Sequence, residues 1–185
     1  MMRALTLTVL FLSFISTSAW ADVAADRSSI QSMKEKTLTR LYSEEPNARK
    51  EIENAEGYAV FSSGGVNLVL FSAAYGSGIA HDNKSGGDTY MKMASGGVGI
   101  GLGIKDYRLV FVFKTRKAFN QFVTYGWDLS GQADAAVKAG TEGEELSEAA
   151  NIMPGMKVYQ LTESGLALQA TIQGTKYWKN SNLND

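Results

Sequence analysis

The stretch Ala94-Ser-Gly-Gly-Val-Gly-Ile-Gly-Leu-Gly-Ile104 decides how this chain folds. Read as an extended strand, it places glycines on one side and aliphatic side chains on the other, because successive strand residues point to opposite faces. The glycines are Gly97, Gly99, Gly101 and Gly103, and the aliphatic residues are Val98, Ile100, Leu102 and Ile104. Glycine inside a strand costs about 0.5–1 kcal/mol relative to alanine, whereas a whole domain has only about 5–15 kcal/mol of net stability. We therefore expect another part of the protein to lie close against the bare side of this strand.

A glycine-rich stretch can also cradle a phosphate group with its backbone N–H groups. The two patterns typical of such loops, G-x-G-x-x-G and G-x-x-x-x-G-K-[ST], occur neither here nor elsewhere in the chain. The residues therefore favour a structural role for the glycines over a ligand-cradling one.

The first 21 residues have the pattern of a secretory signal peptide. Arg3 provides the positive charge, residues 4–15 form an apolar stretch, and Ala19-Trp20-Ala21 is a small-x-small cleavage site. The apolar stretch is too short to span a bilayer comfortably. We therefore predict a cleaved signal peptide over residues 1–21, in preference to a buried N-terminal helix, and export to the periplasm.

The composition is that of one globular domain. The chain has 185 residues, of which 44% are hydrophobic and 20% are charged, and this length allows one domain with a sizeable core. Removal of residues 1–21 takes away one arginine and no acid, so the net charge changes from −1 to −2, which does not favour nucleic acid as a partner. The absence of cysteine excludes disulfides, thiolate catalysis and thiolate metal sites. We expect a single domain over residues 22–185, with no cofactor and no metal.

The chain after the signal peptide begins with a helical pattern and changes to an extended one at Gly57. Apolar residues recur at helical spacing over residues 26–42. Pro46 suits the first turn of a second helix that ends before Gly57. We expect the apolar stripes of these helices to cover a sheet rather than a membrane surface.

The extended part of the chain predicts an antiparallel sheet. We expect a short strand over residues 58–61, a bend at residues 62–65 and a strand over residues 66–75. A polar turn at residues 81–87 then leads through residues 88–93 into the glycine-rich strand.

The remaining segments predict one more buried strand, a capped helix and a closing hairpin. Asp106 is expected to begin a turn and residues 107–113 to form a buried strand, and Thr115 suits the N-cap of a helix that Gly126 ends. Residues 157–161 and 166–177 are expected to pair as a hairpin.

Residues 131–140 fit either a strand or a short helix, and residues 142–148 are expected to be an exposed acidic loop. The sum is an α+β fold, a single domain with a curved, mainly antiparallel glycine-rich sheet and a few packed helices.

Several motifs, taken in order, resemble those of a known family. They are Leu38-Thr-Arg-Leu-Tyr42, Gly57-Tyr-Ala-Val-Phe61, Ala73-Ala-Tyr-Gly-Ser-Gly-Ile-Ala80, Ser95-Gly-Gly-Val-Gly-Ile-Gly-Leu-Gly103 and Leu109-Val-Phe-Val-Phe113, followed by Phe119, Phe122 and Gly126-Trp127. In order and spacing the chain resembles a bacterial exported member of the SYLF domain family, over residues 37–175.

The resemblance implies a compact lipid-binding domain with no catalytic residues to transfer. Eukaryotic members bind phosphoinositides and other acidic lipids, and one branch also binds actin. An exported bacterial protein does not meet actin in its own compartment, and phosphoinositides are not expected there. What the resemblance implies for this chain is therefore binding to an acidic phospholipid or a membrane surface.

The residues themselves do not favour catalysis. His81 is the single histidine, and it falls in the predicted polar turn with no cysteine or G-x-S-x-G serine to act with it. Glu144 and Glu145 fall in the acidic segment, where their ordinary role is solubility. We therefore predict a protein that is not an enzyme.

A basic cluster, Lys114-Thr115-Arg116-Lys117, surrounds the predicted helix start. Each cation at a helix N-terminus is disfavoured by about 0.3–1 kcal/mol, and this turn is commonly acidic in the SYLF family. An anion bound by the free N–H groups and the flanking cations offsets this unfavourable interaction of the cations with the helix dipole. The candidate headgroup-binding residues are Lys105, Arg108, Lys114, Arg116 and Lys117. The alternative is that long, solvated side chains tolerate the mismatch.

A second reading makes the protein a periplasmic scaffold. In that reading Tyr107, Trp127 or Trp178 lies in an interface with another envelope protein.

Overall fold

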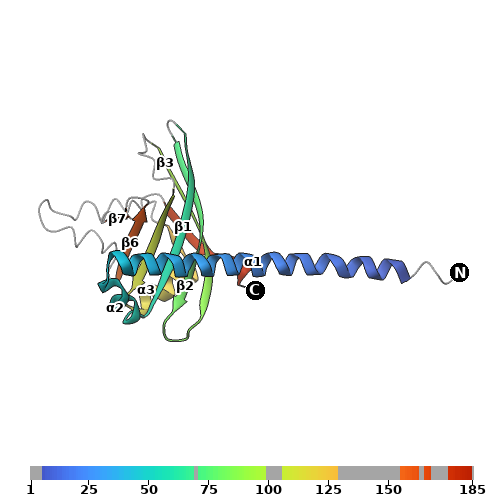
Figure 1. The fold of residues 1–185 in the computed structure, drawn as a ribbon, viewed down its shortest axis with the longest axis horizontal. Coiled ribbons are helices and arrows are strands. Elements are labelled where there is room, and N and C mark those ends of the chain that lie inside the picture. The colour runs from blue at the N-terminus through green and yellow to red at the C-terminus, as the bar shows by residue number, and fades with distance from the viewer. Residues whose placement is uncertain are drawn as a thin grey trace, which may run out of the picture.

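The computed structural model describes residues 6–68, 71–98, 106–128, 155–162, 165–167 and 175–184. These residues form three α-helices, one eight-stranded antiparallel sheet and a short 3-10 helix (Figure 1). The arrangement confirms the predicted α+β class, with packed helices and an antiparallel sheet.

The helices are α1 (Thr6–Glu44), α2 (Asn47–Glu53) and α3 (Arg116–Tyr125), and the 3-10 helix is η1 (Ser181–Leu183). The strands are β1 (Gly57–Leu68), β2 (Phe71–Asp82), β3 (Asp88–Val98), β4 (Asp106–Phe113), β5 (Trp127–Asp128), β6 (Met156–Thr162), β7 (Gly165–Ala167) and β8 (Thr175–Lys179).

The strands follow the order β5-β8-β3-β2-β1-β4-β6-β7 across the sheet. β1 pairs along its whole length with β2, from Gly57 opposite Asp82 to Leu68 opposite Phe71. On its other side β1 pairs with β4, so that Gly57 also lies opposite Phe113. β3 and β4, which follow one another in the sequence, therefore lie on opposite sides of the β1–β2 pair.

The sheet is strongly curved, and its concave side holds an aromatic core. The rings of Tyr177 on β8 and Phe111 on β4 have centroids 5.2 Å apart, although β3, β2 and β1 lie between these strands. In a flat sheet the same strands are about 19 Å apart, at about 4.8 Å per neighbour. Phe122 of α3 packs against both rings. α3 therefore closes the concave side.

The convex side is covered by α1 and α2. Figure 1 shows α1 crossing the strands and continuing beyond the edge of the sheet. Leu41 of α1 and Ile52 of α2 pack with Val60, Val110 and Val112 of β1 and β4. Each fully buried aliphatic side chain of this kind contributes about 1.5–3 kcal/mol. This packing confirms that the helices use their apolar stripes to cover the sheet.

Within the described ranges, no helix combines the length and the apolar character that crossing a membrane requires.

β1 is one continuous strand, so the predicted bend at residues 62–65 is wrong. Residues 62–64 pair with β2 on one side and with β4 on the other. Because both neighbours satisfy the backbone N–H and C=O groups, these small residues continue the strand instead of bending it. The hairpin comes later, between Leu68 and Phe71, and the strand predicted over residues 66–75 is divided between β1 and β2.

Two further boundaries differ from the sequence prediction. Asp106 begins β4, opposite Gly64, instead of a turn. β6 and β7 do pair in antiparallel fashion, with Thr162 opposite Gly165, and β7 is described over Gly165–Ala167. Thr175–Lys179 instead forms β8, which pairs with β3 and β5 on the other side of the sheet. Alternation within a strand identifies its two faces but not its neighbouring strands. The pairing of β8 with β3 and β5 could therefore not be predicted from alternation.

Other predicted elements are confirmed. The helix over residues 26–42 lies within α1, Pro46 immediately precedes α2, and residues 107–113 fall in β4. The predictions for residues 131–140 and 142–148 lie outside the described residues.

A side chain approaches a glycine closely in β2, outside the stretch for which such an approach was predicted. A Cβ atom on Gly78 would overlap the ring of Phe61 and lie 2.5 Å from the carbonyl oxygen of Val60. Phe61 thus covers Gly78, and the lack of a side chain leaves room for it. In the glycine-rich stretch, Gly97 lies in β3 opposite Ser72. Outside the described residues lie Gly99, Gly101 and Gly103.

We expect Gly78→Ala to lower the free energy of unfolding by about 1–3 kcal/mol, because Phe61 must leave its place in the concave core. Urea unfolding followed by circular dichroism measures this change. Gly87→Ala is the matched control, since a Cβ atom there would meet only the hydroxyl oxygen of Ser85, at 3.2 Å, and we expect a change below about 0.5 kcal/mol. Equal unfolding midpoints for the two variants would contradict the packing described for Gly78.

Candidate functional site

Residues 114–117 form the corner between β4 and α3, which we call the α3 corner. Thr115 has extended backbone angles, φ −128° and ψ 141°, and its side chain accepts a hydrogen bond from a backbone N–H three residues later. Gly126 ends the helix with a φ of 69°, a left-handed conformation that glycine adopts without strain. Phe119 and Phe122 anchor α3 in the concave core. The predicted N-cap and the predicted helix end are both confirmed.

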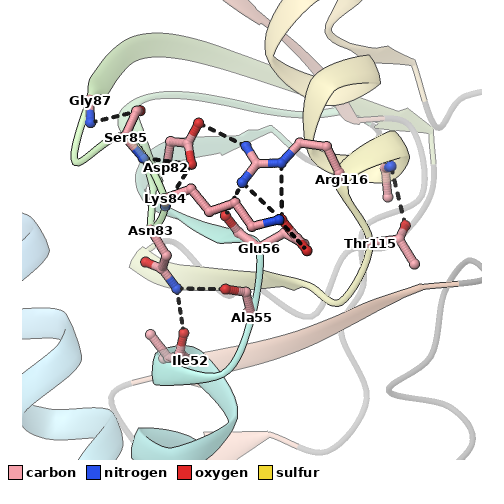
Figure 2. A network of polar contacts seen from close by, with 11 residues as sticks. Ile52, Ala55, Glu56, Asp82, Asn83, Lys84, Ser85, Gly87, Thr115 and Arg116 are labelled. Atoms are coloured by element: carbon pink, nitrogen blue, oxygen red, sulfur yellow. Dashed lines mark hydrogen bonds and ion pairs between the residues drawn. The ribbon is translucent and has the colours of Figure 1, made fainter.

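The Arg116 guanidinium lies between two carboxylates from other elements, as Figure 2 shows. Its Nη1 lies 2.7 Å from Oδ2 of Asp82, at the end of β2, and its Nε lies 3.0 Å from Oε2 of Glu56, just before β1. Nζ of Lys84 also lies 2.9 Å from Oε2 of Glu56. The cation that the helix N-terminus disfavours is therefore compensated from within the chain.

The turn between β2 and β3 positions these groups. Oδ1 of Asp82 accepts a hydrogen bond from the backbone N–H of Lys84 at 2.9 Å. Nδ2 of Asn83 donates to the carbonyl oxygens of Ile52 and Ala55, at 2.7 and 2.9 Å. One polar network therefore joins the end of α2, the β2–β3 turn and the start of α3 (Figure 2).

These contacts also set the protonation of the network. The hydrogen bond from Arg116 holds the pKa of Asp82 well below its ordinary value of 3.8. The hydrogen bond from Lys84, together with one from Arg116, lowers the pKa of Glu56 against the opposing effect of burial. The hydrogen bond to Asp82 in turn raises the pKa of Arg116. Arg116 is therefore a charged group whose partners are two carboxylates of the same chain.

The two lysines of the α3 corner have different surroundings. Burial opposes ionisation of Glu51 on α2, but hydrogen bonds from Lys157 and Tyr159 and the nearby charges of Lys157 and Lys114 lower its pKa. Lys117 is exposed, and none of the ion pairs among the described residues involves it. Lys114 is exposed as well and forms none of these ion pairs, although its charge acts on Glu51.

A cleft of about 310 Å³ lies beside α3. Its apolar walls include Phe113, Phe122, Trp127 and Met156. Lys117 and Gln121, which also line the cleft, are exposed and therefore lie at its mouth. The volume is at the lower end of the range of about 300–1,000 Å³ that small-molecule sites occupy.

An exposed tyrosine continues this side of the helix. The Tyr125 side chain is 84% exposed and lies one turn beyond Gln121, on the same side of α3. Lys117, Gln121 and Tyr125 therefore form one exposed row, which we call the α3 row. Tyr125 was not among the site residues predicted from the sequence. Its spacing of four residues from Gln121 could have indicated that both lie on one side of the helix.

The structure does not bring the five candidate basic residues into one patch. Arg108 lies near the start of β4, opposite Ser62, and Lys114 follows six residues later, roughly 20 Å away along the strand. Lys105 lies outside the described residues. Lys114, Arg116 and Lys117 are together at the α3 corner, but Arg108 is at the other end of the strand.

The aromatic residues proposed for a protein interface are also separated. Tyr107 is 9% exposed and belongs to the concave core, so it is not available for an interface. Trp127 lines the cleft, and Trp178 is half-buried on β8.

His81 lies at the end of β2 and not in the turn. Its Nδ1 is 2.7 Å from Oδ1 of Asp88, and its ring centroid is 5.2 Å from that of Tyr58. Asp88 also accepts a hydrogen bond from Gln31 of α1 at 2.7 Å and lies 3.6 Å from Nζ of Lys34. These contacts tie α1 to β3. Over the described ranges, no three histidine, aspartate or glutamate side chains gather as a metal site requires.

The fold and the α3 corner together define an α+β domain with the features of a binding surface: free positive charge, an exposed tyrosine and an apolar cleft.

The comparison with known families identifies which domain this is. The family model described as "Ysc84: Las17-binding protein actin regulator" matches residues 94–185. The chain belongs to this family, the SYLF family, as its motifs predicted. SYLF domains are known as binding domains.

A bacterial relative supports the same membership. The chain is 40% identical over 159 residues to "Beta cell expansion factor A" of Aeromonas veronii. These residues make up 86% of this chain and 59% of the relative. The chain therefore spans a little under three fifths of the length of the relative that it matches.

We expect Arg116→Met to lower the stability of the protein at pH 7 and to weaken the dependence of stability on pH. The folded pKa values of Asp82 and Glu56 lie below their ordinary values of 3.8 and 4.5. Their pairing therefore stabilises the fold above those ordinary values and is lost as the pH falls through the lower folded values.

Urea unfolding at pH 7 and at pH 2 tests this expectation. The difference between the native protein and Arg116→Met should be largest at pH 7 and should shrink at pH 2. Lys36→Met, at an exposed position of α1, should match the native protein at both pH values. A constant difference at the two pH values would show that the carboxylates are not the partners that matter.

Proposed function

We propose that this protein is a non-enzymatic domain of the cell envelope that binds a membrane surface through acidic lipid headgroups. The observation that carries the proposal is the α3 row, in which exposed Lys117 and Tyr125 lie on one side of a single helix.

This pair of side chains suits the boundary of a bilayer. Tyrosine is enriched at the level of the headgroups because its ring is apolar and its hydroxyl is polar. A lysine close to an anionic bilayer contributes about 1 kcal/mol of binding. Since few groups of the described surface take part, we expect weak association that falls with rising salt concentration.

The periplasm is the proposed location. The signal-peptide pattern of residues 1–21 supports export, and cleavage before Asp22 stays a prediction. An anionic phospholipid of a bacterial envelope membrane is then the proposed partner of the α3 row.

The description of the family suggests a protein partner instead. The family description names Las17 binding and actin regulation, and the bacterial relative is named for the expansion of beta cells. We transfer neither activity to this chain, since export separates it from actin and the relative extends well beyond the shared part. A protein scaffold is the alternative function, and the aromatic Trp127 beside the cleft is the observation that favours it. A stable envelope partner retained without lipid would support that alternative.

Co-sedimentation with vesicles tests the membrane proposal. We expect the protein to sediment with vesicles of phosphatidylglycerol and to stay in solution with phosphatidylcholine. Lys117→Glu should weaken the binding to phosphatidylglycerol by at least about fivefold, because it removes a cation and adds an anion at the α3 row.

The control is Lys36→Glu, which makes the same change of charge at an exposed position of α1. It should bind nearly as the native protein does. Equal losses in the two variants would mean that net charge and not the α3 row governs binding. Equal sedimentation with both kinds of vesicle would contradict the acidic headgroup as the partner.

A further inference from the structure

The convex side of the sheet has a part that α1 does not cover. Figure 1 shows β3 extending well beyond the level at which α1 crosses the strands. α1 packs against one row of side chains on this side, which are Val60 of β1, Ile79 of β2 and Tyr90 of β3. Because side chains alternate along a strand, the next row on the same side lies two residues further along each strand. It consists of Trp178, Lys92, Ser77, Ser62 and Arg108, all exposed or half-buried.

An exposed tyrosine stands at the centre of this uncovered part. The side chain of Tyr75 is 69% exposed, because its neighbours in the sheet, Gly64 and Ala94, are too small to cover its ring. Tyr75 is diagonal to Lys92, which places their Cβ atoms about 7–8 Å apart. Lys92 in turn lies directly opposite Trp178. Two aromatic side chains therefore flank one cation, and we call Tyr75, Lys92 and Trp178 the convex cluster.

The charge of the convex cluster is positive at its centre. None of the ion pairs among the described residues includes Lys92, and its neighbours in the sheet, Ser77 and Trp178, carry no charge. Asp106 at the start of β4 and Asp128 on β5 occupy register positions at the margins. This arrangement attracts a partner whose negative charges are widely spaced, and it disfavours a densely charged one such as nucleic acid.

The floor around the convex cluster is small and polar. It is formed by Ser62, Gly64, Ser77 and Ala94. A bilayer binds a surface in proportion to the apolar area that becomes buried, and a protein interface has an apolar core, so both partners fit this floor poorly. Serine hydroxyls instead donate and accept hydrogen bonds, which suits a ligand that carries many hydroxyl groups.

We propose that the convex cluster binds an acidic polysaccharide, with sugar rings stacked on Tyr75 and Trp178 and a carboxylate at Lys92. A sugar ring has an apolar C–H face, which the negative face of an aromatic ring attracts. A carboxylate forms a charge-assisted hydrogen bond with a lysine. The inference goes beyond the proposed function, because it concerns another surface and another class of ligand. The α3 row belongs to a helix that closes the concave side, whereas the convex cluster lies on the other side of the sheet.

Titration of a fluorescently labelled oligogalacturonate with the native protein, followed by anisotropy, tests this inference. Oligogalacturonate is the probe because each of its sugar rings carries one carboxylate. We expect saturable binding that weakens as the salt concentration rises. A labelled malto-oligosaccharide, which has sugar rings but no charge, should bind about fivefold more weakly. Polyglutamate and a single-stranded oligonucleotide, which are acidic but offer no such sugar face, should compete poorly.

Matched variants locate the ligand. Tyr75→Ala should weaken oligogalacturonate binding by about fivefold, whereas Tyr75→Phe, which keeps the ring, should bind as the native protein does. Tyr125→Ala, which removes an exposed tyrosine of α3, is the control. Lys92→Glu should also weaken binding by about fivefold, and Lys36→Glu, at an exposed position of α1, should not. Circular dichroism verifies that each variant keeps its fold.

The outcomes separate this inference from the proposed function. No saturable binding of oligogalacturonate, or binding that Tyr75→Ala and Lys92→Glu leave unchanged, overturns the convex cluster as a polysaccharide site. Equal affinity for the neutral oligosaccharide overturns the role of Lys92, and equal competition by polyglutamate or the oligonucleotide overturns the sugar as the ligand.

The membrane proposal stands or falls on other variants. Lys117→Glu should leave oligogalacturonate binding intact, and Lys92→Glu should leave sedimentation with phosphatidylglycerol vesicles intact. Vesicle binding that is lost in Lys92→Glu, with oligogalacturonate binding unchanged, would assign the convex cluster to the membrane and overturn the polysaccharide. Oligogalacturonate binding in a protein that ignores anionic vesicles supports the convex cluster and overturns membrane-surface binding.

Discussion

The aromatic contact across the concave side is the constraint on which the rest of the structure depends. Tyr177 and Phe111 meet at 5.2 Å although three strands lie between β8 and β4, and this contact requires a strongly curved sheet. Phe61 and Phe122 pack against the same rings. Because Phe122 belongs to α3, the curvature of the sheet also decides where that helix lies. The opposite side of α3, with Lys117 and Tyr125, therefore faces solvent.

The start of α3 shows how the fold resolves an unfavourable charge pattern. Lysines and an arginine surround a helix N-terminus, where the dipole disfavours cations. From the sequence we predicted that a bound external anion compensates these charges. The structure supplies the carboxylates of Asp82 and Glu56 to Arg116 instead, and these contacts join α3 to α2 and to the β2–β3 turn. One of the three cations thus serves the fold, and Lys114 and Lys117 stay at the surface.

This division of roles connects stability to the proposed binding. The core contacts that hold Phe113, Phe122 and Trp127 in place also form the walls of the cleft. The exposed groups around it supply charge and an amphipathic ring, which suit the boundary between water and lipid.

The sequence alone determined the features that depend on neighbours along the chain. The alternation of residues 107–113 identified the two faces of β4, Thr115 and Gly126 marked the ends of α3, and the ordered motifs identified the family. These signals are local, because strand alternation, capping and helix termination act over a few residues. Only the tertiary structure decided the partners of each strand, the carboxylates that face Arg116 and the cleft beside α3. Glu56 lies 60 positions from Arg116, and no local pattern encodes that distance, since the curvature of the sheet and the burial of its aromatic core bring such residues together.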